Sequence, residues 1–105
     1  MELLVINFGL KGIAESDYRG VCDELAPAFA AVPGLAHKVW LADSSNGVYG
    51  GVYTFENGSA LEAFLGSELF AQVGAMPVLK DITVQRFSVL SGPTEVTRGL
   101  VGASA

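Results

Sequence analysis

The sequence predicts an α+β fold, a ferredoxin-like sandwich in which four antiparallel strands form one sheet and two helices cover one of its faces. Three observations predict it. The 105 residues are enough for one hydrophobic core and too few for two. Strand-like and helix-like segments follow in the order strand, helix, strand, strand, helix, strand. An Asn-Gly pair marks a hairpin at the centre of that order, and right-handed crossovers on either side complete the sandwich.

The first strand and the first helix are predicted from two kinds of apolar spacing. Glu2 to Phe8 is apolar at nearly every position, which is typical of a strand in the middle of a sheet. A helix is expected to begin near Ser16 and to end at Pro33-Gly34. Its apolar face recurs at helical spacing in Tyr18, Val21, Cys22, Leu25, Phe29 and Val32. Pro27 lacks an N–H, so it should kink or divide this helix.

A β-hairpin is expected in the middle of the chain. Leu35 to Ala42 and Val48 to Phe55 are predicted as its two strands. The turn between them contains Asn46-Gly47, which is among the strongest short-range hairpin signals because both residues tolerate positive φ.

The remaining elements are a second helix and a last strand. Ser59 and Glu62 have the spacing of a capping box at a helix N-terminus, and a strand is expected from about Asp81 to Leu90. Residues 1–90 thus form a single domain. The tail, residues 91–105, is rich in glycine and small residues, so we expect it to be flexible unless it crosses onto a second subunit.

The composition predicts a homodimer. Half of the residues are hydrophobic and only 16% are charged, which leaves apolar surface for a partner or a pocket. One face of the predicted sheet carries no helix, and a second copy of the chain can cover it, which gives a dimeric α+β barrel. The net charge of -5 argues against nucleic acid and against an anionic membrane as partners, because both attract basic surfaces.

The sequence also bears on compartment and cofactors. No apolar run approaches the roughly 18 residues that cross a bilayer, and the first residues lack the basic region of a signal peptide, so we expect a cytoplasmic protein. Cys22 is the only cysteine and His37 the only histidine. A disulfide within the chain and an ordinary zinc or non-haem iron site are therefore excluded. The sequence has no phosphate-binding loop and no dinucleotide fingerprint, so neither a metal nor a bound cofactor is expected.

The hairpin places the only tryptophan opposite a glycine. A short turn at residues 44–46 pairs Trp40 with either Gly50 or Gly51. A glycine at this position either seats the indole against the neighbouring strand or leaves space for a ligand ring beside it.

Side-chain alternation brings polar and aromatic groups together on the hairpin. Lys38 and Trp40 share one face of their strand, and Tyr49 and Tyr53 share one face of the next. If Trp40 pairs with Gly51, all four side chains line one surface, whereas a slip of one residue sends the tyrosines to the other side. Such a surface suits a small aromatic, partly phenolic ligand, because the rings give flat contact and an ammonium stabilises an anion. The alternative is an aromatic cluster of the core with Lys38 reaching solvent.

Four single residues have both a functional and a structural interpretation. His37 is a candidate general base, or a structural histidine on an apolar strand face. Asn7 either orients a substrate carbonyl or belongs to a strand-end turn. Arg86 either pairs with an anionic substrate or lies exposed at a surface or interface. Cys22, on the apolar helix face, is expected to pack in the core.

Three segments carry a resemblance to a known family: Gly34-Leu-x-x-Lys-Val-Trp40, Gly50-Gly-Val-Tyr-Thr-Phe55 and Ser59-Ala-Leu. With them the chain resembles the YdhR-type monooxygenases of the dimeric α+β barrel superfamily, which includes the antibiotic-biosynthesis monooxygenases. The resemblance runs from the first strand to about Val89, includes the proline inside the first helix and leaves the tail unmatched.

The resemblance implies a cofactor-independent monooxygenase. Better understood relatives oxidise a polycyclic phenol to a quinone with dioxygen as the co-substrate: the phenol is deprotonated, its anion reduces oxygen, and the hydroperoxide loses water. Trp40 and Tyr53 would hold the ring, and Lys38 would stabilise the anion. His37 stands where some relatives carry an aromatic residue, which makes its role in proton transfer a hypothesis. The candidate catalytic residues are thus Lys38, His37 and Trp40, and the candidate substrate-binding residues are Tyr53, Tyr49, Asn7 and Arg86.

Other functions stay open at this point. A related isomerase or cyclase of aromatic polyketide metabolism would need the same surface. A dimeric binding protein would hold a small aromatic compound without turnover. Haem binding or degradation would require His37 to face a cavity wide enough for a porphyrin.

Overall fold

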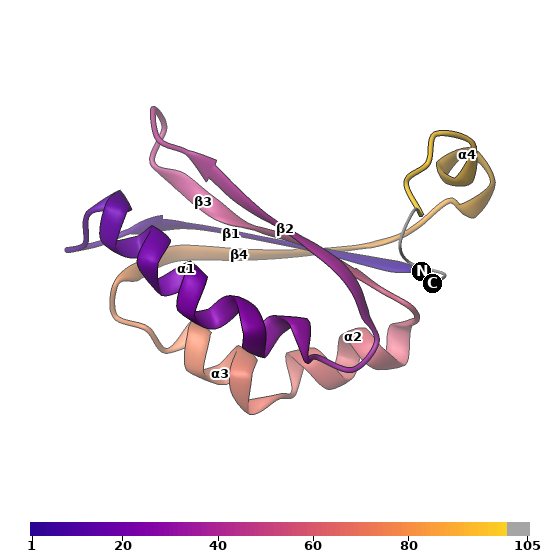
Figure 1. The fold of residues 1–105 in the computed structure, drawn as a ribbon, viewed down its shortest axis with the longest axis horizontal. Helices are drawn as coiled ribbons and strands as arrows, with labels where there is room; N and C mark the ends of the chain where they lie inside the picture. Colours follow the sequence, from indigo (N-terminus) through magenta and orange to yellow (C-terminus); the bar gives the residue numbers. More distant parts are fainter. Residues whose placement is uncertain (101–105) are drawn as a thin grey trace.

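A computed structural model describes residues 1–100 and confirms the predicted fold (Figure 1). One antiparallel sheet has the strand order β2-β3-β1-β4. Its strands are β1 (Glu2–Leu10), β2 (Leu35–Asp43), β3 (Val48–Phe55) and β4 (Leu79–Ser88). The helices are α1 (Glu15–Ala30), α2 (Gly58–Leu65), α3 (Glu68–Gly74) and α4 (Ser91–Val96). The first three helices lie along one face of the sheet, and α4 lies at its far end, away from them (Figure 1).

β1 lies in the middle of the sheet, between β3 and β4, as its apolar run predicts. Leu4 and Ile6 point toward the helices and are buried in the core, together with Phe55 of β3 and Leu61 of α2. The alternate residues of β1 belong to the opposite face, which no α1, α2 or α3 residue covers (Figure 1). We call this opposite side of the sheet the open face.

The helix α1 runs through Pro27 without dividing, so the division that was one of the two expected effects of this proline does not occur. The helix begins at Glu15, next to the predicted Ser16, but Ala14 precedes it without a side-chain cap. Pro27 is exposed and lies within the last turn of the helix. The carbonyl that its missing N–H leaves free can therefore bond to water, so the helix continues.

The predicted capping box at the second helix is wrong. Asn57 precedes α2, and its side chain accepts a hydrogen bond from the N–H of Ala60 at 2.8 Å. Ser59 thus lies inside the first turn, and Glu62 forms an ion pair with Arg86 on β4. Asn57 outcompetes the serine because both residue types cap well and asparagine comes first along the chain.

The second predicted helix is in fact two short helices. Gly66 ends α2, and the Ser67 side chain accepts a hydrogen bond from the N–H of Phe70 at 3.2 Å, which starts α3. This break turns the chain, so that α3 lies beside α1 and faces the β4 end of the sheet (Figure 1). α3 contains no buried residue.

The hairpin forms as predicted, with the register in which Trp40 pairs with Gly51. Lys38 pairs with Tyr53 and Ala42 pairs with Tyr49 in the same ladder. Because residues directly opposite one another share a face, Lys38, Trp40, Tyr49 and Tyr53 all point toward the helices. An extra residue, Ala36, forms a bulge at the start of β2.

The short helix α4 begins at Ser91, and a single domain that ends at residue 90 stays a prediction. Pro93, Thr94 and Leu100 flank a groove at one end of the open face, beside Leu3 and Phe87. That residues 91–105 form a flexible or subunit-crossing tail stays a prediction, and residues 101–105 lie outside the described part of the chain. Within residues 1–100, no helix is long and apolar enough to cross a membrane.

Candidate functional site

The site is centred on the amine of Lys38, which lies in a cage of aromatic rings. Its Nζ is 3.4 Å from the centroid of the Phe29 ring and 3.4 Å from that of Trp40. The Tyr53 ring follows at 4.5 Å. The faces of aromatic rings carry partial negative charge, so such a cage holds a cation. The alternative of a plain core cluster expected Lys38 to reach into solvent. Its amine instead lies against the rings.

Gly51 makes room for this arrangement. A Cβ atom at that position would lie 3.0 Å from Cε of Lys38 and 3.2 Å from Cε1 of Tyr53. The absence of a side chain at Gly51 therefore leaves room for Lys38 and Tyr53 as well as for the indole of Trp40. Gly50 has a different role: its φ is +151°, and a Cβ there would collide with the carbonyl of Ile6. That glycine lets β3 approach β1 closely.

Burial lowers the pKa of Lys38 to about 7. The amine has no ion pair with a carboxylate within residues 1–100, so the ammonium loses hydration without gaining a counter-ion. The ring faces favour the ammonium and oppose part of this effect. Neutral amine and ammonium are thus both accessible near neutral pH, which is the condition for a group that accepts and returns a proton.

A small cavity of about 40 Å³ lies beside the cage, between the sheet, α1 and the α3–β4 connection. Its lining is almost entirely apolar. The residues of this lining whose side chains contain a polar group are Tyr18, Cys22, Lys38, Trp40 and Tyr53. The apolar residues include Phe8, Leu25, Phe29, Val73 and Met76. Tyr18, Cys22 and Trp40 also line an open groove between α1 and β2, so the cavity wall at that point is one side chain thick.

Two tyrosines of the cavity are held in their neutral form. Burial raises the pKa of Tyr53 and, with the neighbouring Cys22, that of Tyr18. Within the described residues, the Tyr49 hydroxyl forms a hydrogen bond to oxygen. The hydroxyls of Tyr18 and Tyr53 form none to oxygen or nitrogen in that part of the chain. The cavity therefore combines an amine that titrates near neutrality with phenol groups that can donate a hydrogen bond to a ligand.

Tyr18, Cys22 and Phe29 are site residues that the sequence analysis missed. It placed all three on the apolar face of α1, which is correct. Their spacing of about one helical turn, i to i+4 for Tyr18 and Cys22, was a signal that both hydroxyl and thiol face the hairpin. The packing interpretation of Cys22 holds only in part, because its side chain borders both the cavity and the groove.

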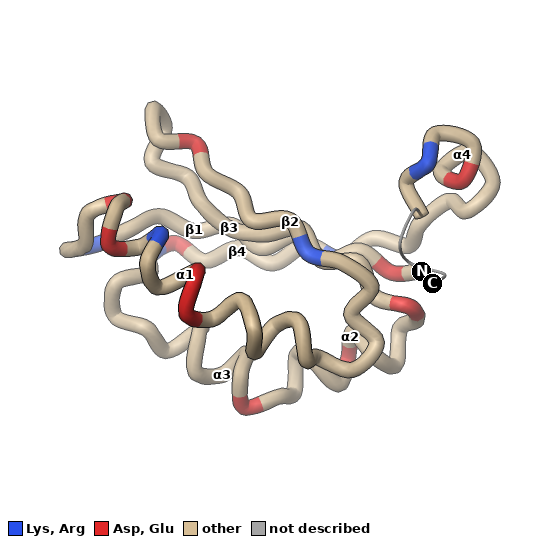
Figure 2. Tube along the Cα trace, viewed as in Figure 1, with Lys and Arg blue, Asp and Glu red and all other residues tan. Residues whose placement is uncertain are grey.

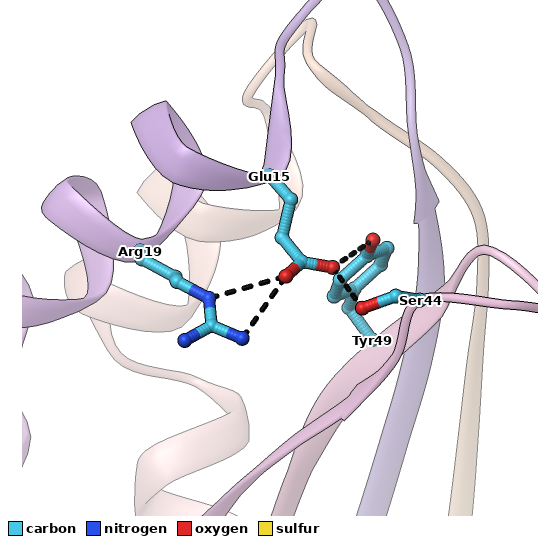
Figure 3. Close-up of polar contacts among 4 residues, drawn as sticks. All are labelled: Glu15, Arg19, Ser44 and Tyr49. Carbon is cyan, nitrogen blue, oxygen red and sulfur yellow. Dashed lines mark hydrogen bonds and ion pairs between the residues drawn. The ribbon is translucent and has the colours of Figure 1, made fainter.

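Tyr49 shares the sheet face of Lys38 but belongs to a separate polar cluster (Figure 3). Its hydroxyl donates a hydrogen bond to Oε1 of Glu15 at 2.7 Å. Ser44 donates to the same oxygen, and Arg19 donates to Oε2 at 3.0 Å and 3.2 Å. The hydrogen bonds from Ser44 and Tyr49, with the Arg19 guanidinium, lower the pKa of Glu15, and the carboxylate raises that of Tyr49. The cluster joins the start of α1 to the tip of the hairpin.

Three predicted site residues lie outside the cavity. His37 pairs with Thr54 across the hairpin and belongs to the open face, and its Nε2 is buried with no hydrogen-bond partner in the described structure. Asn7, also on the open face, donates a hydrogen bond to the carbonyl of Tyr49 at 3.4 Å. Arg86 is exposed on β4 and pairs with Glu62. The cavity brings together Lys38, Trp40 and Tyr53 but not His37, Asn7 or Arg86. His37 meets Lys38 and Trp40 only along an open groove beside the cavity.

The residues that the structure describes contain no group of three or more His, Cys, Asp or Glu side chains placed to hold a metal ion. A haem ligand is also poorly provided for. The only histidine belongs to the open face of the sheet and does not line the cavity.

The fold is a small ferredoxin-like α+β sandwich, and it matches the fold of solved monooxygenase structures. The chain belongs to the family described as "Putative mono-oxygenase ydhR", whose pattern matches residues 3–100. The match extends past Val89 into the tail, farther than the sequence resemblance reached. No curated protein matches the chain.

Solved structures support the fold. SnoaB, a cofactor-independent oxygenase from Streptomyces nogalater, superimposes as its N63A mutant with a TM-score of 0.69 at 20% identity, covering 85% of this chain and 92% of that one. An antibiotic biosynthesis monooxygenase from Deinococcus radiodurans gives 0.72 at 15% identity, with 85% and 92% covered. MhuD, a heme-degrader from Mycobacterium tuberculosis, gives 0.69 at 17% identity, with 86% and 96% covered.

Proposed function

We propose that the protein is a cofactor-independent monooxygenase that oxidises a phenolic ring to a quinone with dioxygen, using the cavity beside Lys38. One observation carries the proposal: an amine whose pKa burial lowers to about 7 lies in an aromatic cage, with no carboxylate to neutralise it. A group of this kind removes a proton from a phenol or its keto tautomer and then stabilises the anion as an ammonium. The family and the SnoaB fold support the same reaction class.

The reaction balances without a further reagent. Neutral Lys38 takes a proton from the substrate, and the electron-rich anion transfers an electron to dioxygen. The two radicals combine to form a carbon–oxygen bond, and the peroxide takes a proton back from the ammonium. Loss of water then breaks the oxygen–oxygen bond and leaves the quinone. For an anthrone, one molecule of dioxygen gives one anthraquinone and one water. The apolar cavity suits these steps because exclusion of water protects the anion.

The other cavity residues have positioning roles in this proposal. Trp40 and Phe29 offer ring faces at about a right angle, 85°, to each other, and a flat substrate can stack against one while it touches the edge of the other. The Tyr53 hydroxyl, kept neutral by burial, would donate a hydrogen bond to the developing oxyanion.

A polycyclic substrate needs a larger space than the cavity of about 40 Å³ provides, since ligand sites typically span about 300 Å³ or more. The wall formed by α3 is the part of the cavity that can be displaced. Val73 and Met76 contribute to the lining, while α3 itself contains no buried residue. Leu69, Phe70 and Val73 of α3 pack against the core but stay partly exposed, so displacement of α3 would uncover part of the core without exposing a fully buried side chain of the helix.

The test is oxidation of anthrone by the purified protein, followed by absorbance of anthraquinone, in air and under nitrogen. We expect oxygen-dependent product formation above the spontaneous rate, with a loss of about 100-fold in the enzymatic rate for Lys38→Met. Lys80→Met, on exposed β4, is the matched control and should keep the wild-type rate. An enzymatic rate that Lys38→Met leaves intact would remove the lysine from the mechanism.

Binding without turnover is the competing function. Aromatic ligands would then quench Trp40 fluorescence and be recovered unchanged from the same aerobic mixture. Recovery of intact anthrone at the spontaneous oxidation rate, together with saturable quenching, would establish the binding protein and exclude the oxygenase.

We also propose that two copies pair through the open face. β3 contains no charged residue and β1 only Glu2, and the charged side chains of the chain lie mainly on helices, loops and strand ends (Figure 2). Val39 and Phe87, both on the open face, are 54% and 51% exposed. A second copy suits this surface, because a neutral apolar face is complementary to itself even in a protein with a net charge of -5.

A further inference from the structure

Lys38 differs from the other two lysines of the chain in its surroundings. Lys11 and Lys80 are exposed, whereas Lys38 is partly buried and its Nζ lies against two ring faces at 3.4 Å. No hydrogen bond or salt bridge occupies its amine within residues 1–100. An amine that is held in an apolar site without a counter-ion is activated as a nucleophile, because its lone pair is free in the neutral form.

The amine can be reached from outside the molecule. Lys38, Phe29 and Trp40 line the cavity and also an open groove of about 290 Å³ at the end of α1 beside β2. His37 lines this groove as well but not the cavity, so Lys38 is the residue with an amine that borders both spaces. Cys22 does not line this groove. It lines the other groove between α1 and β2, together with Tyr18 and Trp40.

The small volume of the cavity limits the size of what the amine can hold there. A water molecule needs about 10–15 Å³ of such space, so a cavity of about 40 Å³ takes only a few non-hydrogen atoms. The lining is almost entirely apolar, and Lys38 is one of the residues that form it. A short apolar chain with one polar carbon–oxygen group fits this combination.

We propose that Lys38 is a covalent capture site for a small apolar carbonyl compound, such as a short-chain aldehyde, which it binds as a Schiff base. The amine nitrogen attacks the carbonyl carbon, a carbon–nitrogen bond forms, and the oxygen takes a proton to give a carbinolamine. The hydroxyl then leaves as water, and the nitrogen loses its second proton. Amine and aldehyde thus give an imine and one water, with no oxidant or reductant. Tyr18 and Tyr53 line the same cavity, and their hydroxyls would supply the proton that the departing oxygen takes.

This inference uses the same cavity as the proposed oxygenase but no oxygen chemistry, so the two are tested separately. The probe is propanal with sodium cyanoborohydride, under nitrogen and without any phenol. The reductant converts each imine to a stable N-propyl lysine. Peptide mapping by mass spectrometry then gives the labelling rate of Lys38, with Lys11 and Lys80 as internal controls in the same molecule.

We expect Lys38 to be labelled at least about 10-fold faster than either exposed lysine at pH 7. The rate at Lys38 should rise as the pH increases to about 8 and then level off, because the amine is then fully neutral. Equal or slower labelling of Lys38 in the folded wild-type protein overturns the inference, and this measurement needs no variant. Lys38→Arg should abolish the fast phase, whereas Lys80→Arg should keep it.

The outcomes separate the two proposals. Fast labelling of Lys38 together with no anthrone oxidation supports covalent capture and rejects the oxygenase. Anthrone oxidation that depends on Lys38 without fast labelling rejects covalent capture alone. Denaturation of the wild-type protein in urea before labelling should remove the difference among the three lysines, and a difference that persists in urea would contradict a site made by the fold.

Discussion

The amine of Lys38 lies 3.4 Å from the centre of the Trp40 ring, on the same face of the same strand. Two residues apart on a strand, these side chains point in one direction. Gly51 opposite them leaves room for the lysine, and the Phe29 ring on α1 lies 3.4 Å from the same amine. Lysine protonation and indole environment are therefore coupled, which gives the chain an internal optical probe.

Trp40 fluorescence should titrate with a midpoint near pH 7. Protonation of Lys38 places a positive charge on the indole face, and its pKa is about 7. The change should be absent in Lys38→Met. His37→Gln is the control, because this only histidine neighbours Lys38 in sequence but faces the open side of the sheet. A transition that disappears in His37→Gln and survives in Lys38→Met would assign it to the histidine instead.

Stability should rise with pH between about 7 and 10. The folded pKa of Lys38 lies at about 7, whereas an unfolded lysine has one near 10.4. In this range the unfolded chain binds more protons than the folded chain, so the free energy of unfolding increases with pH. Urea denaturation at pH 6, 7, 8 and 9 measures the slope. Lys38→Met should flatten it, and an unchanged slope in the variant would assign the effect to other groups.

Tyr53 and Tyr49 should respond differently to loss of the hydroxyl. Tyr53→Phe removes a group that has no hydrogen bond to protein oxygen or nitrogen within residues 1–100. It should lower the rate of anthrone oxidation about 10-fold or more and change stability by less than about 0.5 kcal/mol. Tyr49→Phe breaks the hydrogen bond to Glu15 and should lower the urea midpoint while the rate stays the same. The reverse pattern would move the site to the Glu15 cluster.

Gly50 and Gly51 should tolerate alanine to different degrees. In Gly50→Ala the methyl group meets the Ile6 carbonyl and the φ of +151° is unfavourable, so a loss of about 3 kcal/mol or more is expected. In Gly51→Ala the methyl group meets the flexible end of Lys38 at 3.0 Å, which should cost about 1–2 kcal/mol and displace the amine from its cage. Denaturant unfolding measures the first effect, and the pH midpoint of Trp40 fluorescence measures the second.

The open face should carry the dimer contact. Sedimentation equilibrium should give about twice the chain mass of 10.9 kDa. Val39→Lys places a charge on the edge strand β2 of the open face, where the side chain is 54% exposed, and should give a folded monomer. Ala28→Lys, on the exposed side of α1, should stay dimeric. A wild-type monomer at micromolar concentration would reject the pairing.

The part of the site that could be predicted from the sequence is the part that the hairpin makes. Asn46-Gly47 sets the turn, the turn sets the register, and the register puts Lys38, Trp40 and Tyr53 on one face. These are local consequences of strand geometry. The same reasoning put Tyr49 on that face correctly but could not give its partner, because Glu15 comes from the start of α1.

The contribution of α1 could not be predicted because it depends on how the helix crosses the sheet. Helical spacing identifies an apolar face that includes Tyr18, Cys22 and Phe29. It does not say which of these residues meets the lysine. That is decided by long-range packing, in which Phe29 is buried against Tyr53 and Phe64. The wrong N-cap of α2 has a similar cause. Asn57 and Ser59 both satisfy the residue preference for an N-cap, so the preference alone does not decide between them.

The short helix α3 makes one side of the molecule easier to open than the rest. With no buried residue between Gly66 and Gly74, its amide protons should exchange with deuterium at a free-energy cost well below that of global unfolding, unlike those of β1 and β3. Enlargement of the cavity can then occur many times during the lifetime of one folded molecule. Variants that make α3 more rigid would slow the binding of large ligands while leaving the melting temperature almost unchanged.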